Sequence, residues 1–467
     1  MGYLEKIFDN RVQERKYKVL KEVAKSSWEG VEAFSVFNEI ANTIVKKGES
    51  SESCCIYKDR AIMADRIRLA LGGNKKNPNI VQVIDIACDE CPEAGYVVTD
   101  MCRGCIAHSC GDACKLNAIE IDNHNKAHIN KNLCVECGKC AEACPYSAIH
   151  NYQRPCEKSC KVDAISMGEG GEAWIDPEKC IDCGACVYHC PFGATVDVSS
   201  IGEIIKTIIG SENNTKYKVY ATVAPSISSQ FDYAKQGQVI SAIRKLGFYD
   251  VVEVALGADM IAKKEAKELT EKGFLTSSCC PAFVEYIDSK FPELKKYVST
   301  NLSPMAEIGK YIKEKDPDSK VIFIGPCIAK KAEVRKEEVK EYVDYVMTFE
   351  ELQAMIDSKD ILLSEQKESE LNQASEFGKG FAKAGGLVEA IRHGVNEINS
   401  PEFEFKPVSC DGVENCKKIL LRAGKGRLDN NFIEGMACEG GCIGGAGNLT
   451  HSEKNRYIVS RKSINIK

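Results

Sequence analysis

Residues 434–448 read EGMACEGGCIGGAGN and place Cys438 and Cys442 four positions apart. Two thiolates at this spacing can bind one compact inorganic centre. The glycines that follow lack Cβ atoms, so the backbone can approach a bulky ligand closely and can turn through positive φ. The stretch therefore favours a metal centre enclosed by the C-terminal part of the chain. By itself, a glycine-rich loop with incidental cysteines explains it equally well.

Two cysteine loops upstream favour the metal centre. The run LTSSCCPAF sets Cys279 beside Cys280, and IGPCIAKKAE sets Cys327 three positions before Lys330. Neighbouring side chains cannot easily ligate one metal ion, so we expect one of Cys279 and Cys280 to bind while the other points into the cavity. A lysine three residues after a ligand can lie over an anionic centre and donate hydrogen bonds to it.

Together the three loops resemble the signature loops of the [FeFe]-hydrogenases, whose pattern runs approximately TSCCP, PCxxKxxE and MACxxGCxxGG. The resemblance extends from about Val219 to Leu449 and implies the reversible conversion of two protons and two electrons into H2. It also implies an H-cluster, in which a [4Fe–4S] cubane is joined to a diiron unit with CO, cyanide and azadithiolate ligands. The positions that match the cubane ligands are Cys280, Cys327, Cys438 and Cys442, and Cys442 would also bridge to the diiron unit.

Other matched positions surround the expected diiron unit. Cys279 matches the family's proton-transfer thiol, and Lys330 matches the lysine that contacts a cyanide ligand. The remaining positions that resemble cofactor-binding residues are Met436, Glu333 at the end of the PCxxKxxE pattern, and the turn formed by Ala224, Pro225 and Ser226.

A proton route is implied by the same resemblance. Glu265 and Glu268 lie three positions apart on an expected helix, which puts both carboxylates on one face. Ser299 falls where the family carries a relay serine. The implied order is Glu268, Ser299, Glu265 and Cys279, from the surface to the metal. A helix this rich in Glu and Lys is otherwise most often a solvated face.

The three loops also depart from the family pattern. The departures are an extra serine at Ser277 or Ser278, Phe283 where many members have Trp, Gly325 where the commonest have Met, and Asn448 with Leu449 in place of Gln and Pro. They indicate a divergent branch, and they bear on the rate and direction of catalysis more than on the kind of centre.

Composition narrows the class of protein. The chain has 467 residues, a net charge of -6 and 25 cysteines. No basic run indicates nucleic-acid binding, no apolar stretch reaches the roughly 18 residues of a membrane span, and the charged N-terminus lacks the apolar core of a signal peptide. We therefore expect a cytoplasmic protein with no nucleic-acid or membrane partner. Because cytosolic thiols stay reduced, this many cysteines indicate metal binding.

The region between Cys102 and Cys190 holds fourteen of the cysteines. Two runs in it, CVECGKCAEACPYSAI and CIDCGACVYHCPFGAT, match the bacterial ferredoxin pattern CxxCxxCxxxCP. Zinc sites favour two separated pairs instead of four closely spaced cysteines ending in proline. The recurring KLNAI, PYSAI, KVDAI and PFGAT after the last cysteine of each unit indicate tandem ferredoxin modules.

In such modules the fourth cysteine of one run ligates the neighbouring cluster. That rule predicts three accessory [4Fe–4S] clusters, held by Cys102, Cys105, Cys110 and Cys144, by Cys134, Cys137, Cys140 and Cys114, and by Cys160, Cys180, Cys183 and Cys186.

Two further cysteines of the region, Cys156 and Cys190, have no partners under this assignment. The upstream pair Cys88 and Cys91 could complete a fourth cluster with them, which would use sixteen cysteines in four sets of four. The alternative is three clusters and four idle thiols, because a lone CxxC pair is a weak signal. Cys410 and Cys416 belong to no signature and are expected to be structural.

The fold class follows from these segments. We expect an α+β and α/β multidomain protein, in which tandem ferredoxin-like modules are followed by a two-lobed α/β H-cluster domain. Residues 1–95 show mostly helical periodicity, residues 96–198 hold the cysteine repeats, and residues 199–467 carry helices alternating with apolar strands such as KVIFIGPC. Open α/β sheets place their chemistry at the carboxyl ends of strands, where Cys327 falls.

The sequence thus favours an [FeFe]-hydrogenase fed with electrons through [4Fe–4S] clusters. A small ferredoxin is the expected redox partner, because no nucleotide or flavin motif is present, and proteins that build the diiron unit would be needed for maturation. The alternatives are a hydrogen sensor with low turnover, a hydrogenase-like iron–sulfur assembly protein without the diiron unit, and a simple electron carrier, which would not need the second half of the chain.

Overall fold

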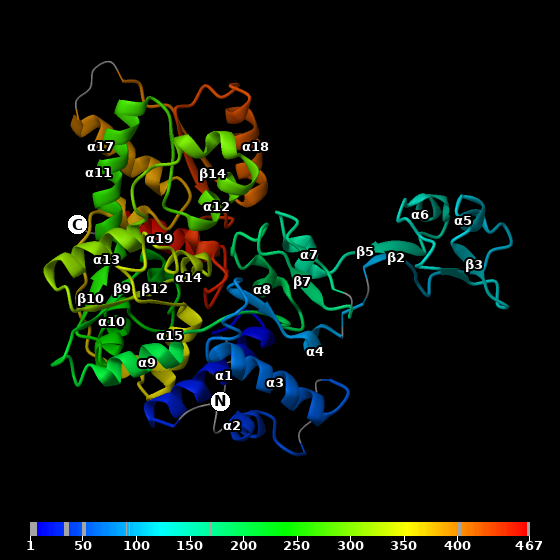
Figure 1. Ribbon diagram of the computed structural model, residues 1–467, viewed down its shortest axis with the longest axis horizontal. Helices are drawn as coiled ribbons and strands as arrows, with labels where there is room; N and C mark the ends of the chain where they lie inside the picture. Colours follow the sequence, from blue (N-terminus) through cyan, green and yellow to red (C-terminus); the bar gives the residue numbers. More distant parts are fainter. Residues whose placement is uncertain are drawn as a thin grey trace.

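Two parallel β-sheets organise the second half of the chain, and cysteine-rich modules extend from them (Figure 1). The computed structural model describes residues 7–31, 37–48, 53–89, 91–92, 94–168, 170–398 and 403–464. Within these ranges, none of the helices has the length and apolar character needed to cross a membrane. The architecture is mixed α/β, as the sequence predicts.

The larger sheet has four parallel strands in the order β10 (Asp250–Glu253), β9 (Val219–Val223), β12 (Lys320–Ile324) and β13 (Tyr345–Met347). Its strands are buried apolar runs, as expected for a parallel sheet covered on both faces. The helices and short 3-10 turn that surround it are α9 (Ile201–Gly210), η2 (Pro225–Ser229), α10 (Gln236–Lys245), α13 (Pro304–Lys315), α14 (Ala329–Glu333) and α15 (Phe349–Ser358).

The smaller sheet has three parallel strands in the order β11 (Leu275–Thr276), β15 (Phe432–Met436) and β14 (Pro407–Asp411). The helices and 3-10 turns of this lobe are α11 (Val254–Lys272), α12 (Pro281–Lys290), η3 (Pro292–Tyr297), α16 (Glu376–Gly380), α17 (Gly386–Ile398), α18 (Val413–Gly424), η5 (Cys442–Gly444) and α19 (Lys454–Ile464). The 3-10 turn η4 (Leu363–Glu365) packs against α10 and belongs to the core around the larger sheet.

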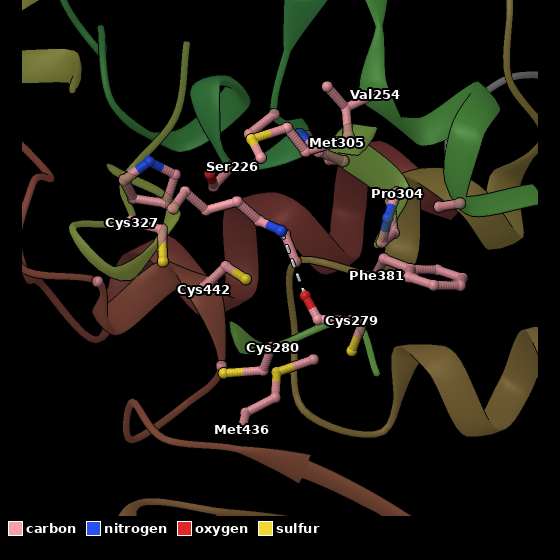
Figure 2. Close-up of a pocket in the computed structure, with 18 of the residues that line it drawn as sticks. Ser226, Val254, Cys279, Cys280, Pro304, Met305, Cys327, Phe381, Met436 and Cys442 are labelled. Atoms are coloured by element: carbon pink, nitrogen blue, oxygen red, sulfur yellow. Dashed lines mark hydrogen bonds between the residues drawn. The ribbon is translucent and has the colours of Figure 1, made fainter. Parts of the chain in front are cut away.

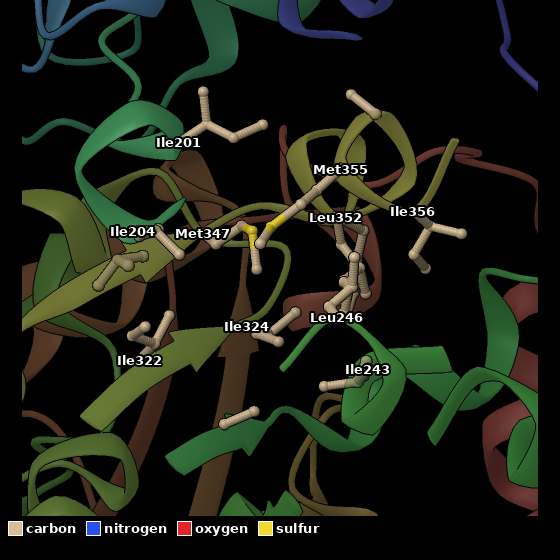
Figure 3. Close-up of a cluster of buried hydrophobic side chains, with 14 of the residues drawn as sticks. Ile201, Ile204, Ile243, Leu246, Ile322, Ile324, Met347, Leu352, Met355 and Ile356 are labelled. Atoms are coloured by element: carbon tan, nitrogen blue, oxygen red, sulfur yellow. The ribbon is translucent and has the colours of Figure 1, made fainter. Parts of the chain in front are cut away.

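The main hydrophobic core lies around the larger sheet (Figure 3). Ile322 and Ile324 of β12 pack there with Leu352 of α15 and Ile204 of α9. The N-terminal helices α1 (Arg11–Trp28), α2 (Phe37–Ile44) and α3 (Ile56–Ala70) contribute to the same core, and α1 packs against α15 and α9. The predicted helical character of the N-terminal region is present, and α1 shares its core with the larger sheet.

The apolar run IVQVIDIACDECP predicts a strand that carries Cys88 and Cys91, but it forms less strand than that. Only β1 (Val81–Val83) is extended, and it pairs antiparallel with β8 (Thr195–Asp197). The chain then turns into α4 (Asp85–Cys88), so Cys88 ends a helical turn and does not lie on a strand. The prediction of a continuous strand here was wrong, because the partner strand β8 is only three residues long and the pairing ends with it.

The cysteine repeats form two separate modules. The distal module projects away from the rest of the chain (Figure 1) and holds β2 (Gly95–Val98), α5 (Ser109–Asp112), β3 (Ile119–Ile121), β4 (Ala127–Ile129), α6 (Lys139–Ala143) and β5 (Ile149–Tyr152). The proximal module lies against the α/β domain and holds α7 (Pro155–Ser159), β6 (Ile165–Met167), β7 (Ala173–Ile175) and α8 (Ala185–His189). Antiparallel pairing of β2 with β5 forms the neck between the modules.

The four repeat units share one local geometry. Three positions after the last cysteine of each unit the backbone has positive φ, at Asn117, Ser147, Asp163 and Gly193. The alanine that follows donates its N–H to the sulfur of that cysteine at 3.2–3.4 Å, in the pairs Ala118 to Cys114, Ala148 to Cys144, Ala164 to Cys160, and Ala194 to Cys190. Donors aimed at the sulfurs are a feature of iron–sulfur sites.

A buried network of charges joins the N-terminal helix, the proximal module and the larger sheet. Asp197 of β8 accepts from Lys16 of α1 at 2.6 Å and from Lys331 of α14 at 2.8 Å. Lys16 also pairs with Glu350 at 2.6 Å, and Lys331 with Glu351 at 2.8 Å. Asp197 is 2% exposed, and the two lysines hold the pKa of its carboxyl well below the usual range although burial opposes them.

We expect Asp197→Asn to lower the free energy of unfolding by about 3–5 kcal/mol, because it leaves two buried ammonium groups undercompensated. Anaerobic urea unfolding followed by circular dichroism measures the effect. The control Glu203→Gln removes an exposed pair with Lys206 and should cost less than about 1 kcal/mol. Equal shifts of the two midpoints would contradict the importance of the network.

Candidate metal centre

A cavity of about 90 Å³ lies where strands of both sheets end (Figure 2). The carboxyl ends of β9, β12, β11 and β15 lead respectively to Ala224, Cys327, Cys279 with Cys280, and Cys438. Parallel strands of an open sheet present their ends on one side, so two such sheets can deliver loops to a common point. The three cysteine loops, which are far apart in sequence, therefore meet around one space.

All five predicted thiols of the three loops line this cavity. They are Cys279, Cys280, Cys327, Cys438 and Cys442. The charge of Cys438 interacts with those of Cys327, Cys280 and Cys442, so these four lie near one another. Burial raises the pKa of the Cys442 thiol to about 11. Such a group binds as a thiolate only where a cation compensates its charge, which is what a metal centre provides.

The donor set and the space fit an iron–sulfur centre. Within the described residues, no three His, Cys, Asp or Glu side chains converge closely enough to hold a single metal ion. In a cubane each thiolate binds a different iron, so four separate cysteines can serve as its ligands. A Cβ added to Gly441 would lie 2.8 Å from the Met436 sulfur, and one added to Gly445 would lie 2.7 Å from the Pro326 oxygen, so these turns admit only glycine. Ser226 lines the cavity, and its buried hydroxyl has no hydrogen-bond partner in the part of the chain that the structure describes.

Lys330 reaches the cavity from α14, as its matched position implies. Its ammonium donates to Ser303 Oγ at 2.9 Å and pairs with Glu333 at 2.7 Å, and a longer contact of 3.5 Å joins it to the Cys279 carbonyl (Figure 2). Burial opposes its charge, but Glu333 and the neighbouring thiols outweigh burial and raise the pKa of Lys330. It therefore stays cationic and supplies a fixed positive charge beside the thiols.

The rest of the lining is apolar, and the sequence did not single it out. Met305 and Pro304 begin α13 beside the cavity, Val254 begins α11, and Phe381 follows α16 (Figure 2). Pro304 with Met305, and Phe381, are marked in the sequence only by a nearby proline or glycine, as in SPM and GKGFAKAGG. Val254 has no such neighbour. This lining excludes water, which strengthens the interaction of Lys330 with any anion bound there.

The outer part of the predicted proton route is a dense hydrogen-bonded cluster. Glu268 accepts from Ser299 Oγ at 2.9 Å, from Thr300 Oγ1 at 2.9 Å and from Lys272 at 2.6 Å. Burial alone would raise the pKa of Glu268, but these donors outweigh it and lower the pKa. Glu268 is 9% exposed and Lys272 reaches solvent, so this end of the route is at the surface.

The inner carboxyl, Glu265, is completely buried. Its Oε1 accepts from the backbone N–H and the hydroxyl of Ser278, both at 3.3 Å, and its Oε2 has no hydrogen-bond partner in the described residues. Burial raises the pKa of Glu265 from 4.5 to about 7. A carboxyl that changes protonation near neutral pH, lies close to Ser299 and interacts with the Cys279 thiol can exchange protons with both.

A second buried carboxyl, Glu434 of β15, interacts electrostatically with Cys279 and Cys442 and was not singled out in the sequence. Its two oxygens accept backbone N–H groups of Gly385 at 3.0 Å and Val388 at 3.1 Å, at the start of α17. Burial raises its pKa to about 7. It anchors β15, which carries the third cysteine loop, to that helix.

The departures from the family pattern have local explanations. A Cβ on Gly325 would lie 2.5 Å from the Phe323 ring, so Phe323 fills the space that a side chain there would need. Phe283 is fully buried against Gly435, just before the third loop. Asn448 donates to the carbonyls of Ile443 at 2.8 Å and Cys442 at 3.3 Å, and so holds the third loop in its turn.

Some members of each predicted accessory set lie near one another. Electrostatic interactions join Cys110 with Cys105 and Cys144, and Cys140 with Cys134 and Cys114. In the proximal module they join Cys186 with Cys180, Cys183 and Cys160, and Cys190 with Cys88, Cys91 and Cys156. Cys183 also interacts with Cys280, so the third set adjoins the cavity. The ligand assignments themselves remain predictions.

The other cysteines lie apart from these sets. Cys54 and Cys55 fall between two helical runs of the sequence, a position that favours buried free thiols, but both are exposed. The expectation failed because the turn before α3 faces solvent. Cys410 and Cys416 are buried, and their thiols donate to the carbonyls of Glu434 and Met436 on β15 at 3.3 and 3.5 Å. That arrangement suits a structural role.

Two families match segments of this chain. Residues 217–446 match the family described as "Iron only hydrogenase large subunit, C-terminal domain", and residues 127–150 and 173–195 match the "4Fe-4S binding domain". The fold and the two matches define an iron–sulfur protein whose ferredoxin-like domains precede a hydrogenase-type α/β domain. The chain is, more particularly, an [FeFe]-hydrogenase-like protein.

Individual relatives cover only parts of it. Iron hydrogenase 1 of Clostridium pasteurianum is 27% identical over 293 residues, which are 53% of this chain and 51% of that protein. The cytosolic Fe-S cluster assembly factor NAR1 of Kluyveromyces lactis is 38% identical over 85 residues, 18% of each chain. A solved structure of the [FeFe]-hydrogenase HydA1 from Chlamydomonas reinhardtii is similar at a TM-score of 0.46 and 20% identity, over 56% of this chain and 88% of that one. The chain thus spans about half the length of its curated hydrogenase relative.

The buried state of Glu265 predicts a pH-dependent stability. Its pKa is raised in the folded protein, so folding favours the protonated carboxyl, and this contribution is lost as pH rises from about 4.5 to about 7. The free energy of unfolding of the wild type should therefore fall across this pH window. We expect Glu265→Gln to lack this fall, so that the variant becomes more stable relative to the wild type as pH rises. Anaerobic urea unfolding at several pH values measures it. Parallel curves would contradict the raised pKa.

The contact between Phe283 and Gly435 predicts a steric effect. A Cβ on Gly435 would lie 2.1 Å from the Phe283 ring, so Gly435→Ala should destabilise the protein by about 1–3 kcal/mol. Adding Phe283→Leu should recover part of the loss. Gly380→Ala is the control, because its Cβ would meet only Lys383 Cε at 3.8 Å. Thermal unfolding under anaerobic conditions compares the three variants, and equal melting temperatures for Gly435→Ala and the control would rule out the clash.

Proposed function

We propose that this protein is an [FeFe]-hydrogenase that interconverts protons, electrons and H2. The observation that carries the proposal is the meeting of five thiols with Lys330 and the unpartnered Ser226 hydroxyl around one apolar cavity. Cys280, Cys327, Cys438 and Cys442 would hold the cubane, and Cys442 would also hold the diiron unit. When bound, the H-cluster would supply the redox chemistry of hydrogen.

The chain's own residues move the protons. A proton enters at Glu268, whose surface position allows exchange with solvent, and passes through the Ser299 hydroxyl to Glu265. Glu265 then serves Cys279, whose thiol is the last protein group before the cavity. The pKa values of the two carboxyls suit this order, because the pKa of Glu268 is lowered whereas burial raises the pKa of Glu265 to about 7.

Lys330 and the apolar lining set the electrostatics of the site. Its ammonium, held by Ser303 and Glu333, would donate hydrogen bonds to anionic ligands such as cyanide. Met305, Phe381 and Met436 keep water out. Cys183 adjoins Cys280, which supports entry of electrons from the third accessory set.

The proposal also implies a redox partner, maturation proteins and a cellular compartment. Electrons would come from a small ferredoxin, and apolar residues exposed on the distal module, such as Ile106 and Val135, suit contact with a protein partner. Separate maturation proteins would build the diiron unit. We place the reaction in the cytoplasm.

An iron–sulfur assembly role is the second candidate, and the similarity to NAR1 favours it. Such a protein would need the cubane ligands but not a proton relay. The neighbouring carboxyls Glu268 and Glu265 on the way to Cys279, and the placement of Lys330 at the cavity, favour the hydrogenase. A sensor with low turnover would share the whole site and differ only in rate.

The test is infrared spectroscopy of the matured protein under H2, combined with an assay of hydrogen evolution. We expect CO and cyanide bands together with turnover, and we expect Cys279→Ala to lower turnover at least about 100-fold because it removes the last proton donor. Cys416→Ala, outside the cavity, is the control. Bands without turnover would favour the sensor, and iron-replete matured protein without bands would favour the assembly protein.

A further inference from the structure

Four cysteines in the proximal module surround a buried arginine. Cys88 and Cys91 precede every segment that matches a known family, and Cys156 lies between two of them. Cys88 ends α4, Cys156 lies in α7, and Cys190 follows α8. Cys88, Cys156 and Cys190 pack in one buried cluster, and the Cys91 N–H donates to the Cys88 carbonyl at 3.0 Å. Cys88, Cys91 and Cys156 each also interact electrostatically with Cys190. The four thiols therefore share one location.

The buried arginine is Arg154, which is 2% exposed. It donates to Cys88 Sγ at 3.7 Å, to the Cys91 carbonyl at 3.2 Å and to the Pro92 carbonyl at 3.2 Å. Among the described residues, no carboxylate forms an ion pair with it. A further backbone donor, Ala173 N–H, points at Cys88 Sγ from 3.4 Å.

An uncompensated guanidinium is costly to bury. Neutral thiols and two carbonyls do not supply the missing negative charge. A [4Fe–4S] cluster bound by four thiolates is anionic, and hydrogen bonds and charges around its sulfurs tune its potential. The arginine and the four cysteines are therefore each explained by the same ligand.

We propose that Cys88, Cys91, Cys156 and Cys190 hold a fourth accessory [4Fe–4S] cluster, and that Arg154 is its fixed counter-charge. A positive charge beside the cluster stabilises the reduced, more negative state, so Arg154 raises the reduction potential of this cluster. The proposal rests on the iron–sulfur chain of the proposed function, and it does not depend on hydrogen chemistry at the cavity.

The location gives this cluster a place in electron transfer. The neck strands β2 and β5 pair from Gly95 with Tyr152 to Val98 with Ile149, and Cys91 and Cys156 flank their proximal ends. Cys156 also interacts with Cys186 of the third set. The fourth cluster thus stands at the base of the neck, between the distal module and the third set, which adjoins the cavity.

The first experiment counts iron. Full-length protein is reconstituted anaerobically with iron and sulfide, without the diiron unit, and its iron and acid-labile sulfide are measured. We expect Cys91→Ser combined with Cys156→Ser to lose about four iron atoms and one reduced-cluster signal in electron paramagnetic resonance. The control Cys54→Ser combined with Cys55→Ser removes two exposed thiols and should lose none. Unchanged iron in the Cys91 and Cys156 variant would overturn the cluster assignment.

The second experiment keeps all ligands and tests the arginine. A redox titration followed by electron paramagnetic resonance should show one cluster shifted to a more negative potential in Arg154→Gln, with unchanged iron content and a smaller shift in Arg154→Lys. Arg60→Gln is the matched control, because Arg60 likewise clamps a backbone carbonyl, that of Val45. Unchanged potentials in Arg154→Gln would mean that the side chain only holds its loop, and would overturn the counter-charge. Neither experiment uses hydrogen turnover, so a failed hydrogenase assay leaves both results interpretable.

Discussion

The position of Asp197 between Lys16 and Lys331 is the interaction on which the arrangement of the domains depends. Each of these groups comes from a different part of the chain, and each is buried. A charge removed from water must be compensated at short range, so α1, β8 and α14 have only one relative position that satisfies all three. Because Lys331 adjoins Lys330 on α14, the same requirement fixes where the second cysteine loop meets the cavity.

Few polar groups reach the cavity. Its apolar walls make every charge inside more effective, and the few polar atoms that reach it are each held by a partner outside, as Lys330 is by Glu333. Among the described residues the Ser226 hydroxyl is an exception, because it is buried without a hydrogen-bond partner. Phe323 filling the space above Gly325 shows how a divergent loop can keep the walls closed with different side chains.

Cysteine spacing predicted much of the organisation, because cluster-binding turns are local. The repeated turn around Asn117 and Ser147 is encoded within a few residues of each cysteine, so the modules could be recognised from the sequence. Strand ends likewise placed Cys327 correctly at the edge of a parallel sheet. Contacts between distant segments could not be predicted in this way. The ion pairs of Asp197 and the hydrogen bonds of Arg154 with Cys88, Cys91 and Pro92 join segments that are far apart in sequence, so no local pattern predicts them.

The neck between the modules has a consequence for the history of the chain. The chain enters the distal module through β2 and leaves it through β5, and these two strands pair side by side. The roughly fifty residues between them are therefore an insertion whose two ends are adjacent. Segments whose ends are adjacent can be inserted or removed with little disturbance to the host fold. The distal module can therefore have been acquired as a complete unit, and its loss would shorten the path of the electrons without altering the α/β domain.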